Sequence, residues 1–386
     1  PRYQCRDAAI FLAKQHNAKV ILGTATPSIE SYANAKVGKY GLVKLASRFG
    51  DVKMPKIECI SLIDAHKKKE ITSGITFLLR DEIQSALQKK EQIILFQNRR
   101  GYAPYIACAN CNWIPQCKNC DVSLTYHKYT NDLRCHYCGY VQSVMLSCAA
   151  CGSTEMQQRG LGTERIEEDL KLMFPDARIA RMDYDTVKSK HGHNKIIDAF
   201  EDGAFDILVG TQMVTKGLDF KNVNLVGVLN ADALLYYPDF RAIERAYQLL
   251  QQVSGRAGRR EKQGKVSIQI SNVNHQIVDY ILGKEYEDFY QAQLQERKLY
   301  HYPPYSRLIR LTLKHKEIKT TIEAANKLSE YLHTKYGEWV IGPNAPIIQK
   351  INNYYLREIL LKIPKEHKEL NNVKYTIQQA INGLYQ

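Results

Sequence analysis

The feature that most constrains this chain is a run of cysteines between residues 108 and 151. Eight of the ten cysteines of the 386-residue chain lie there, in four Cys-x-x-Cys pairs. In each pair two thiolates are one tight turn apart, and two such pairs supply the four sulfur ligands of one tetrahedral zinc site. The sequence therefore predicts two zinc ions per chain, held by Cys108, Cys111, Cys117, Cys120, Cys135, Cys138, Cys148 and Cys151.

Disulfide bonding is the alternative use of these cysteines, and it suits small secreted chains. Regular pairs in a long chain, with no signal peptide and no apolar run of membrane-spanning length, instead favour metal binding in a reducing cytoplasm. Eight thiolates fill two sites and leave no open coordination position, so we expect the zinc to be structural. His127 and His136 are then not needed as ligands. The four pairs can combine into two sites in three ways.

The net charge of +14 at pH 7 comes from 54 Lys and Arg against 40 Asp and Glu. This balance is compatible with a nucleic-acid partner, but a solvated basic surface has the same composition. With 44% hydrophobic residues the chain can bury sizeable cores, and its length indicates two or three domains.

Outside the cysteine run, short apolar segments alternate with helical patterns. Such segments are typical of buried parallel strands, and the turns at their carboxyl ends are where α/β sheets bind ligands. The alternation predicts a doubly wound α/β domain. Its expected strands are residues 92–96, 177–182, 205–210, 223–229 and 265–270.

The chain on either side of this domain has its own pattern. Near the start, residues 19–22 are predicted to form a buried parallel strand. The helix that begins at Ile29 has two candidate caps, Ser28, or Thr26 with Pro27 at the first helical position. After the α/β domain, one helix is expected over residues 275–298. The remainder alternates strands and helices, which predicts a small α+β domain.

Four segments, in order along the chain, resemble motifs III to VI of superfamily 2 helicases. They are Gly23–Ser28 (GTATPS), Leu95–Pro104 (LFQNRRGYAP), Val209–Phe220 (VGTQMVTKGLDF) and Gln252–Arg259 (QVSGRAGR). The cysteine run directly follows the second segment, in the order CxxCxW, CxxC, Tyr-His, CHYCG. Together these features resemble the PriA-type replication-restart helicases, the primosomal protein N′ family. The resemblance covers nearly the whole chain and is densest over residues 92–260.

The resemblance implies a RecA-like helicase lobe with an inserted zinc-binding domain, the end of a first RecA-like lobe, and the α+β C-terminal domain. The expected boundaries are 1–70 for the end of lobe 1 and a linker, 71–275 for lobe 2, 105–155 for the zinc-binding insert within lobe 2, and 276–386 for the C-terminal domain. It also favours a nested zinc pairing, in which the first and fourth cysteine pairs share one ion and the second and third pairs share the other. Sequential pairing is the alternative.

Roles at the ATP cleft also follow from the resemblance. An arginine finger stabilises charge on the transferred phosphoryl group, and Arg259 is the better candidate for it, with Arg256 as a phosphate contact. The other residues implied at the cleft or lobe seam are Gln252, Gly255, Gly217 and Asp219. The residues implied in DNA contact or in coupling the cleft to DNA are Thr24, Thr26, Arg99, Arg100, Thr211 and Lys216.

One departure from the family pattern matters. The sequence contains neither a P-loop, G-x-x-x-x-G-K-[ST], nor an acidic Mg²⁺-binding motif. Gly160–Gly162 is not a P-loop, because no Gly-Lys-Ser/Thr follows it. We therefore expect the chain to be the C-terminal portion of a longer helicase, with ATP and Mg²⁺ as cofactors of the full-length protein, and expect no ATP hydrolysis by this polypeptide alone.

The function implied is a monomeric, cytoplasmic 3′-to-5′ DNA helicase acting in replication restart and primosome assembly at stalled forks. Its implied partners are single-stranded and forked DNA, single-stranded-DNA-binding protein and other primosome proteins. The alternative, from a different class, is a non-enzymatic zinc-ribbon module for DNA binding or primosome assembly.

Overall fold

The computed structural model describes residues 4–45, 54–97, 105–127, 130–159, 162–183, 192–211, 214, 220, 222–258, 263–283 and 285–383. The chain divides into two compact units, residues 1–42 and residues 43–386, and each is described by itself. No helix within the described ranges is both long and apolar enough to span a bilayer.

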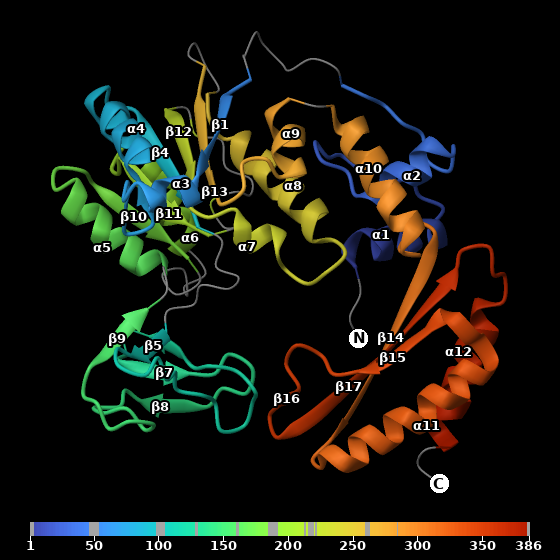
Figure 1. The fold of residues 1–386 in the computed structure, drawn as a ribbon. Coiled ribbons are helices and arrows are strands. Elements are labelled where there is room, and N and C mark those ends of the chain that lie inside the picture. Colours follow the sequence, from blue (N-terminus) through green and yellow to red (C-terminus); the bar gives the residue numbers. More distant parts are fainter. Residues whose placement is uncertain are drawn as a thin grey trace. The chain divides into compact units, whose positions relative to one another are not determined.

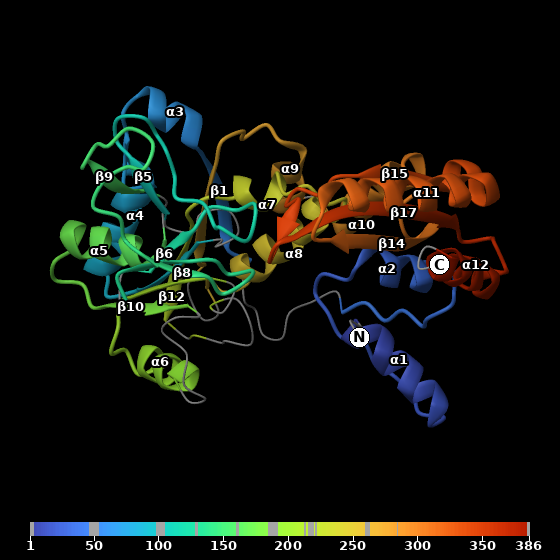
Figure 2. The same ribbon diagram turned by 90° about the horizontal axis from the view of Figure 1, so that it is seen from below.

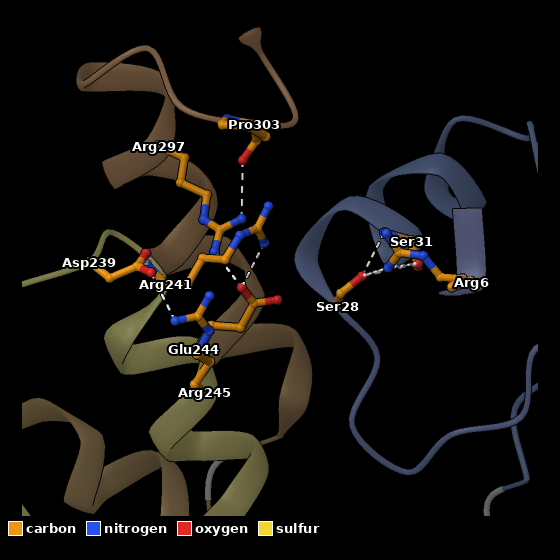
Figure 3. A network of polar contacts seen from close by, with 9 residues as sticks. All are labelled: Arg6, Ser28, Ser31, Asp239, Arg241, Glu244, Arg245, Arg297 and Pro303. Atoms are coloured by element: carbon orange, nitrogen blue, oxygen red, sulfur yellow. Dashed lines mark hydrogen bonds and ion pairs between the residues drawn. The ribbon is translucent and has the colours of Figure 1, made fainter. Parts of the chain in front are cut away.

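The first unit consists of two helices, α1 (Cys5–Gln15) and α2 (Ile29–Lys36). Ser28 caps α2 as predicted, because its side chain accepts a hydrogen bond from the Ser31 N–H, and the Arg6 guanidinium donates to both serine hydroxyls (Figure 3). The buried strand predicted over residues 19–22 is wrong. These residues form no strand, and Ile21 is 95% exposed. A parallel strand needs hydrogen-bonding neighbours, and the described residues of this unit contain no other strand.

A six-stranded parallel sheet is the centre of the second unit, in the order β1-β13-β12-β4-β11-β10 (Figure 1). The five predicted strands are all present. The sheet also includes a strand that precedes the 71–275 range expected for the lobe. The strands are β1 (Lys56–Ser61), β4 (Gln92–Phe96), β10 (Ile179–Met182), β11 (Ile207–Gly210), β12 (Val223–Val228) and β13 (Lys265–Ile270).

Both faces of this sheet are covered. Ile93 and Leu95 of β4 face a core that includes Leu79 of α4 and Leu170 of α5. Strand alternation puts Ile94 on the other face, and its side chain is only 1% exposed. The helices around the sheet are α3 (Leu62–Lys67), α4 (Phe77–Gln88), α5 (Thr163–Met173), α6 (Gly192–Glu201), α7 (Asp232–Leu235), α8 (Ala242–Ser254) and α9 (Gln276–Leu282), and a short hairpin, β2 (Ile71–Thr72) with β3 (Ile75–Thr76), precedes α4.

The cysteine-rich insert leaves the sheet after β4 and returns before α5. Its first and last strands, β5 (Tyr105–Cys108) and β9 (Met156–Arg159), pair antiparallel and bring the two ends of the insert together. Between them lies a three-stranded antiparallel sheet of β6 (Thr125–His127), β7 (Asp132–Arg134) and β8 (Val141–Ser143).

The helix expected over residues 275–298 is in fact two helices. The first, α9, ends at Gly283, whose φ of 157° is accessible to glycine but strained for other residues, and α10 (Tyr286–Leu299) begins three residues later. Glycine at this position interrupts a sequence whose apolar spacing otherwise suits one continuous helix.

The small α+β domain follows α10 as predicted. Its antiparallel sheet has the order β14-β17-β15, with β16 paired to β17, and α11 and α12 pack on one face (Figures 1 and 2). Leu332 of α11 and Ile377 of α12 meet Ile359 and Leu361 of β17 in its core. The elements are β14 (Ser306–His315), α11 (Ile318–Tyr336), the 3₁₀ helix η2 (Gly337–Trp339), β15 (Val340–Asn344), β16 (Lys350–Ile351), β17 (Tyr354–Pro364) and α12 (Leu370–Gly383).

Candidate zinc centres and helicase motifs

The eight cysteines gather into two groups of four, and within each group the sulfur atoms lie within 4.8 Å of one another. This is the nested grouping that the family resemblance favours. The outer site contains Cys108, Cys111, Cys148 and Cys151, and the inner site contains Cys117, Cys120, Cys135 and Cys138.

The sulfur separations suit zinc and exclude disulfides. The Sγ atoms of Cys108 and Cys151 lie 3.6 Å apart, as do those of Cys117 and Cys138. Four sulfurs in a tetrahedron about 2.3 Å from a metal are about 3.8 Å apart, whereas a disulfide bond is about 2.05 Å long. Each group can therefore hold one Zn²⁺ with four sulfur ligands, and no side chain has to move far to do so.

Each knuckle is shaped by its own backbone. In three of the four, an N–H one residue after the second cysteine donates to the carbonyl of the first: Asn112 to Cys108, Gly139 to Cys135 and Gly152 to Cys148. All three donors have positive φ, a conformation that glycine and asparagine tolerate best. Asn or Gly after a Cys-x-x-Cys pair is thus a sequence signal for this turn.

The knuckle backbones also favour thiolates over thiols. The Cys111 N–H and then the Asn110 N–H, as hydrogen-bond donors, lower the pKa of Cys108 to about 6 against the opposing effect of burial. The Asn119 N–H points at Cys117 Sγ and the Ala150 N–H at Cys148 Sγ, each at 3.4 Å. Burial acts the other way and raises the pKa of Cys117 and of Cys120, so without metal each site contains both thiols and thiolates. Thiolate is the form that binds zinc, and the backbone donors act in its favour.

The motif VI segment begins in the last turn of α8. Gln252 is exposed in the last turn of the helix, Gly255 is its C-cap residue, and Arg256 is half-buried. The backbone beyond them is close to the sheet: the Gly258 N–H donates to the Val223 carbonyl, where β12 begins. A Cβ on Gly264 would lie 2.4 Å from the Gly258 nitrogen, so glycine is required at this approach. Arg259 lies outside the described residues.

Motifs IV and V begin at the opposite edge of the sheet. The Gln97 N–H, directly after β4, donates to the Gly210 carbonyl at the end of β11, and Thr211 follows, 9% exposed. Since parallel strands end at one edge, Gln97 and Thr211 are neighbours there, while Gly258, two residues after Arg256, contacts the start of β12. Of the other predicted residues, Arg99, Arg100, Lys216, Gly217 and Asp219 lie outside the described residues, and Thr24 and Thr26 belong to the first unit, where the Thr26 N–H donates to Thr24 Oγ1.

A buried ion pair beside motif VI was not foreseen from the sequence. Glu244 of α8 accepts a 2.7 Å hydrogen bond from Arg297 of α10, and the two side chains are 3% and 2% exposed (Figure 3). Arg297 also donates to the Pro303 carbonyl, and Arg241 contacts the same glutamate at 3.2 Å. The pair joins the motif VI helix to the helix that leads into the C-terminal domain. No local sequence pattern indicates this ion pair, because Glu244 and Arg297 are 53 residues apart.

Three family models match this chain. Residues 117–142 match the PriA DNA helicase Cys-rich region domain, residues 154–261 the helicase conserved C-terminal domain, and residues 298–383 the primosomal protein N C-terminal domain. Their order is the order of the insert, the lobe and the α+β domain in the structure.

Individual relatives agree with these matches. The chain is 41% identical over 372 residues to the replication restart protein PriA of Bacillus subtilis, covering 95% of this chain and 46% of the relative. It is 36% identical over 389 residues to that of Haemophilus influenzae, covering 100% of this chain and 51% of the relative. The chain thus spans about half the length of these relatives. Among solved structures, RecG bound to a three-way DNA junction is 12% identical with a TM-score of 0.39, over 71% of this chain and 26% of that one.

Proposed function

We propose, from the premise that this chain belongs to the PriA family of replication restart proteins, that it forms part of an ATP-dependent 3′-to-5′ DNA helicase. The helicase acts in replication restart and primosome assembly at stalled forks. The observation that carries the proposal is the position of the insert. Two nested four-cysteine sites interrupt a parallel α/β sheet directly after its β4 strand, in a chain that matches PriA proteins over 95% of its length.

One edge of the sheet binds ATP, and the opposite edge binds DNA. At the edge where β12 begins, Arg256 and Arg259 would face the phosphates of ATP, with Arg259 as the finger, and Mg²⁺ bound with ATP would supply further positive charge there. Asp219 serves the same edge, because it precedes Val223 by four residues, a reach of at most about 14 Å. Gly217, next to Lys216, belongs to the segment that passes from the DNA edge to this one. Gln252, exposed beside Gly255, senses the lobe seam.

At the other edge the chain contacts DNA. Arg99, Arg100 and Lys216 bind phosphates, and Thr211 anchors the turn that presents the lysine. Thr24 and Thr26 couple cleft closure to the DNA path. Such contacts are made to the phosphates of the DNA and not to its bases, so binding is largely independent of the DNA sequence. The partners are single-stranded and forked DNA, single-stranded-DNA-binding protein and other primosome proteins, with the helicase acting as a monomer.

The arginine finger gives the sharpest test. In the protein encoded by the whole gene, Arg259→Ala should lower the rate of DNA-stimulated ATP hydrolysis by about 10³-fold or more, because the finger stabilises only the transition state. Affinity for forked DNA should change little. Arg260→Ala, which removes the neighbouring charge, is the matched control and should keep most of the activity. Normal turnover by Arg259→Ala would exclude the finger role. The polypeptide of residues 1–386, which has no P-loop, should show no DNA-stimulated ATPase activity.

A further inference from the structure

The turn between β16 and β17 of the C-terminal domain contacts the inner zinc site. The Asn352 N–H donates to Sγ of Cys120 at 3.1 Å. On either side of this bond, the Asp121 N–H donates to the Lys350 carbonyl at 2.9 Å and the Asn353 N–H to the Asn119 carbonyl at 2.7 Å. The side-chain amides of Asn353 and Asn119 add a fourth bond at 3.1 Å. Four hydrogen bonds therefore join segments that are more than 220 residues apart in sequence.

An apolar contact lies beside these bonds. Ile351 packs against the core of the insert, which contains Cys117, Cys120, Leu124 and Leu133. The isoleucine is half-buried, and it belongs to the two-residue strand β16 rather than to the core of its own domain. Its burial contributes stability only while the turn stays on the insert.

The turn is built to present its N–H groups. Lys350 pairs with Tyr355 and Ile351 with Tyr354, which leaves Asn352 and Asn353 as a two-residue loop. Both have positive φ, 50° and 63°, as in the type I′ turns that match the twist of a hairpin. Asparagine tolerates this conformation, so the loop is held in one shape and its two N–H groups point outward, to the knuckle.

Such a donor acts on metal affinity. Four thiolates around one Zn²⁺ leave a net charge of −2, and N–H donors to the sulfurs offset it. The donors to Cys117 and Cys148 come from their own knuckles, whereas the donor to Cys120 comes from another domain. Metal binding at this site and docking of the C-terminal domain on the insert therefore involve the same hydrogen bond.

We propose that the Asn352–Asn353 turn is an outer-sphere part of the inner zinc site, and that zinc at this site docks the C-terminal domain on the cysteine-rich insert. The coupling is reciprocal: docking tightens zinc binding by the same factor by which zinc favours docking. This inference rests on zinc occupying the inner site, which belongs to the proposed function.

The first experiment measures zinc release from the whole chain to a chromogenic chelator. Ile351→Ser removes the apolar contact, and Asn353→Gly removes one side-chain bond while keeping the positive φ. Outer-sphere changes of this kind cost about tenfold or more in metal affinity. We expect one of the two zinc ions to leave about tenfold faster in Ile351→Ser, less so in Asn353→Gly, and the other at the unchanged rate. Ile347→Ser is the matched control, because Ile347 lies four residues before Ile351, in the connection from β15 to β16, and is 72% exposed.

The second experiment reads docking directly. Amide hydrogen exchange of residues 350–355 should be faster in Cys138→Ser, which damages the inner site, and unchanged in Cys151→Ser, which damages the outer site. Equal release rates for Ile351→Ser and the parent chain, or equal exchange in both cysteine variants, would overturn the coupling. A parent chain without bound zinc would instead overturn the zinc sites themselves, so the two failures are distinguishable.

Discussion

At the residue scale, the buried Glu244–Arg297 ion pair holds two helices, α8 and α10, in a fixed arrangement. Removing two charges from water is costly, and their attraction offsets the cost only when the remaining donors are also satisfied. Here Arg297 donates to a carboxylate and to the Pro303 carbonyl, and Glu244 has a second arginine, Arg241, within 3.2 Å, but the buried Arg297 Nε has no hydrogen-bond acceptor among the described residues. The pair therefore fixes geometry between α8 and α10 more than it adds net stability.

Breaking this pair from one side should destabilise the fold. Arg297→Met removes the guanidinium that hydrogen-bonds this buried carboxylate, and we expect a loss of about 3 kcal/mol in the free energy of unfolding, measured by urea denaturation. Arg245→Met is the matched control: its pair with Asp239 is partly exposed, and we expect a loss below about 1 kcal/mol. The double variant Arg297→Met/Glu244→Leu should recover most of the loss. Failure to recover would mean that Arg297 acts by packing and not by charge.

At the element scale, the sequence predicted those strands and turns whose formation depends mainly on their own residues. The five strands of the lobe and the α+β tail were predictable because each buried element has its own apolar run. The insert was predictable because cysteine spacing encodes its turns. The strand expected at residues 19–22 was wrong, since an apolar run without a neighbouring strand does not make a sheet. The grouping of the cysteines could not come from spacing at all, because every pair has the same spacing.

The nested grouping can be tested by removing cysteines two at a time. Cys108→Ser/Cys148→Ser damages only the outer site, so we expect one zinc ion per chain by metal analysis. Cys108→Ser/Cys117→Ser damages both sites, and we expect almost none. Sequential pairing would give the opposite result for the two variants, because Cys108 and Cys117 would then share one ion and Cys148 would belong to the other.

At the scale of the whole molecule, the contacts that join separate elements are the ones that sequence reasoning missed. Asn352 and Cys120 are 232 residues apart, and Glu244 and Arg297 are 53 apart. Neither side of either contact is unusual in its local sequence. The candidate phosphate-binding residues were recognisable only as parts of family motifs, and several, including Arg259, lie outside the described residues, so for these the sequence is the sole guide.

The +14 charge leads to a prediction about how the whole chain binds DNA. If Arg99, Arg100 and Lys216 bind phosphates, each contact releases counterions and adds about 0.7 to the slope of log affinity against log salt for single strands. We expect the affinity of the chain for a single-stranded oligonucleotide to fall steadily as the salt concentration rises from about 50 to about 200 mM. Fluorescence anisotropy of a labelled oligonucleotide measures this affinity at each salt concentration. Arg99→Ala, Arg100→Ala and Lys216→Ala should each lower the slope by about 0.7 on any sequence.

Lys67→Ala serves as the control, because it removes an equal charge from an exposed position at the end of α3, and its slope should match that of the parent chain. If all four variants had the same slope, the charge would act as a diffuse basic surface and not through phosphate contacts of these three residues.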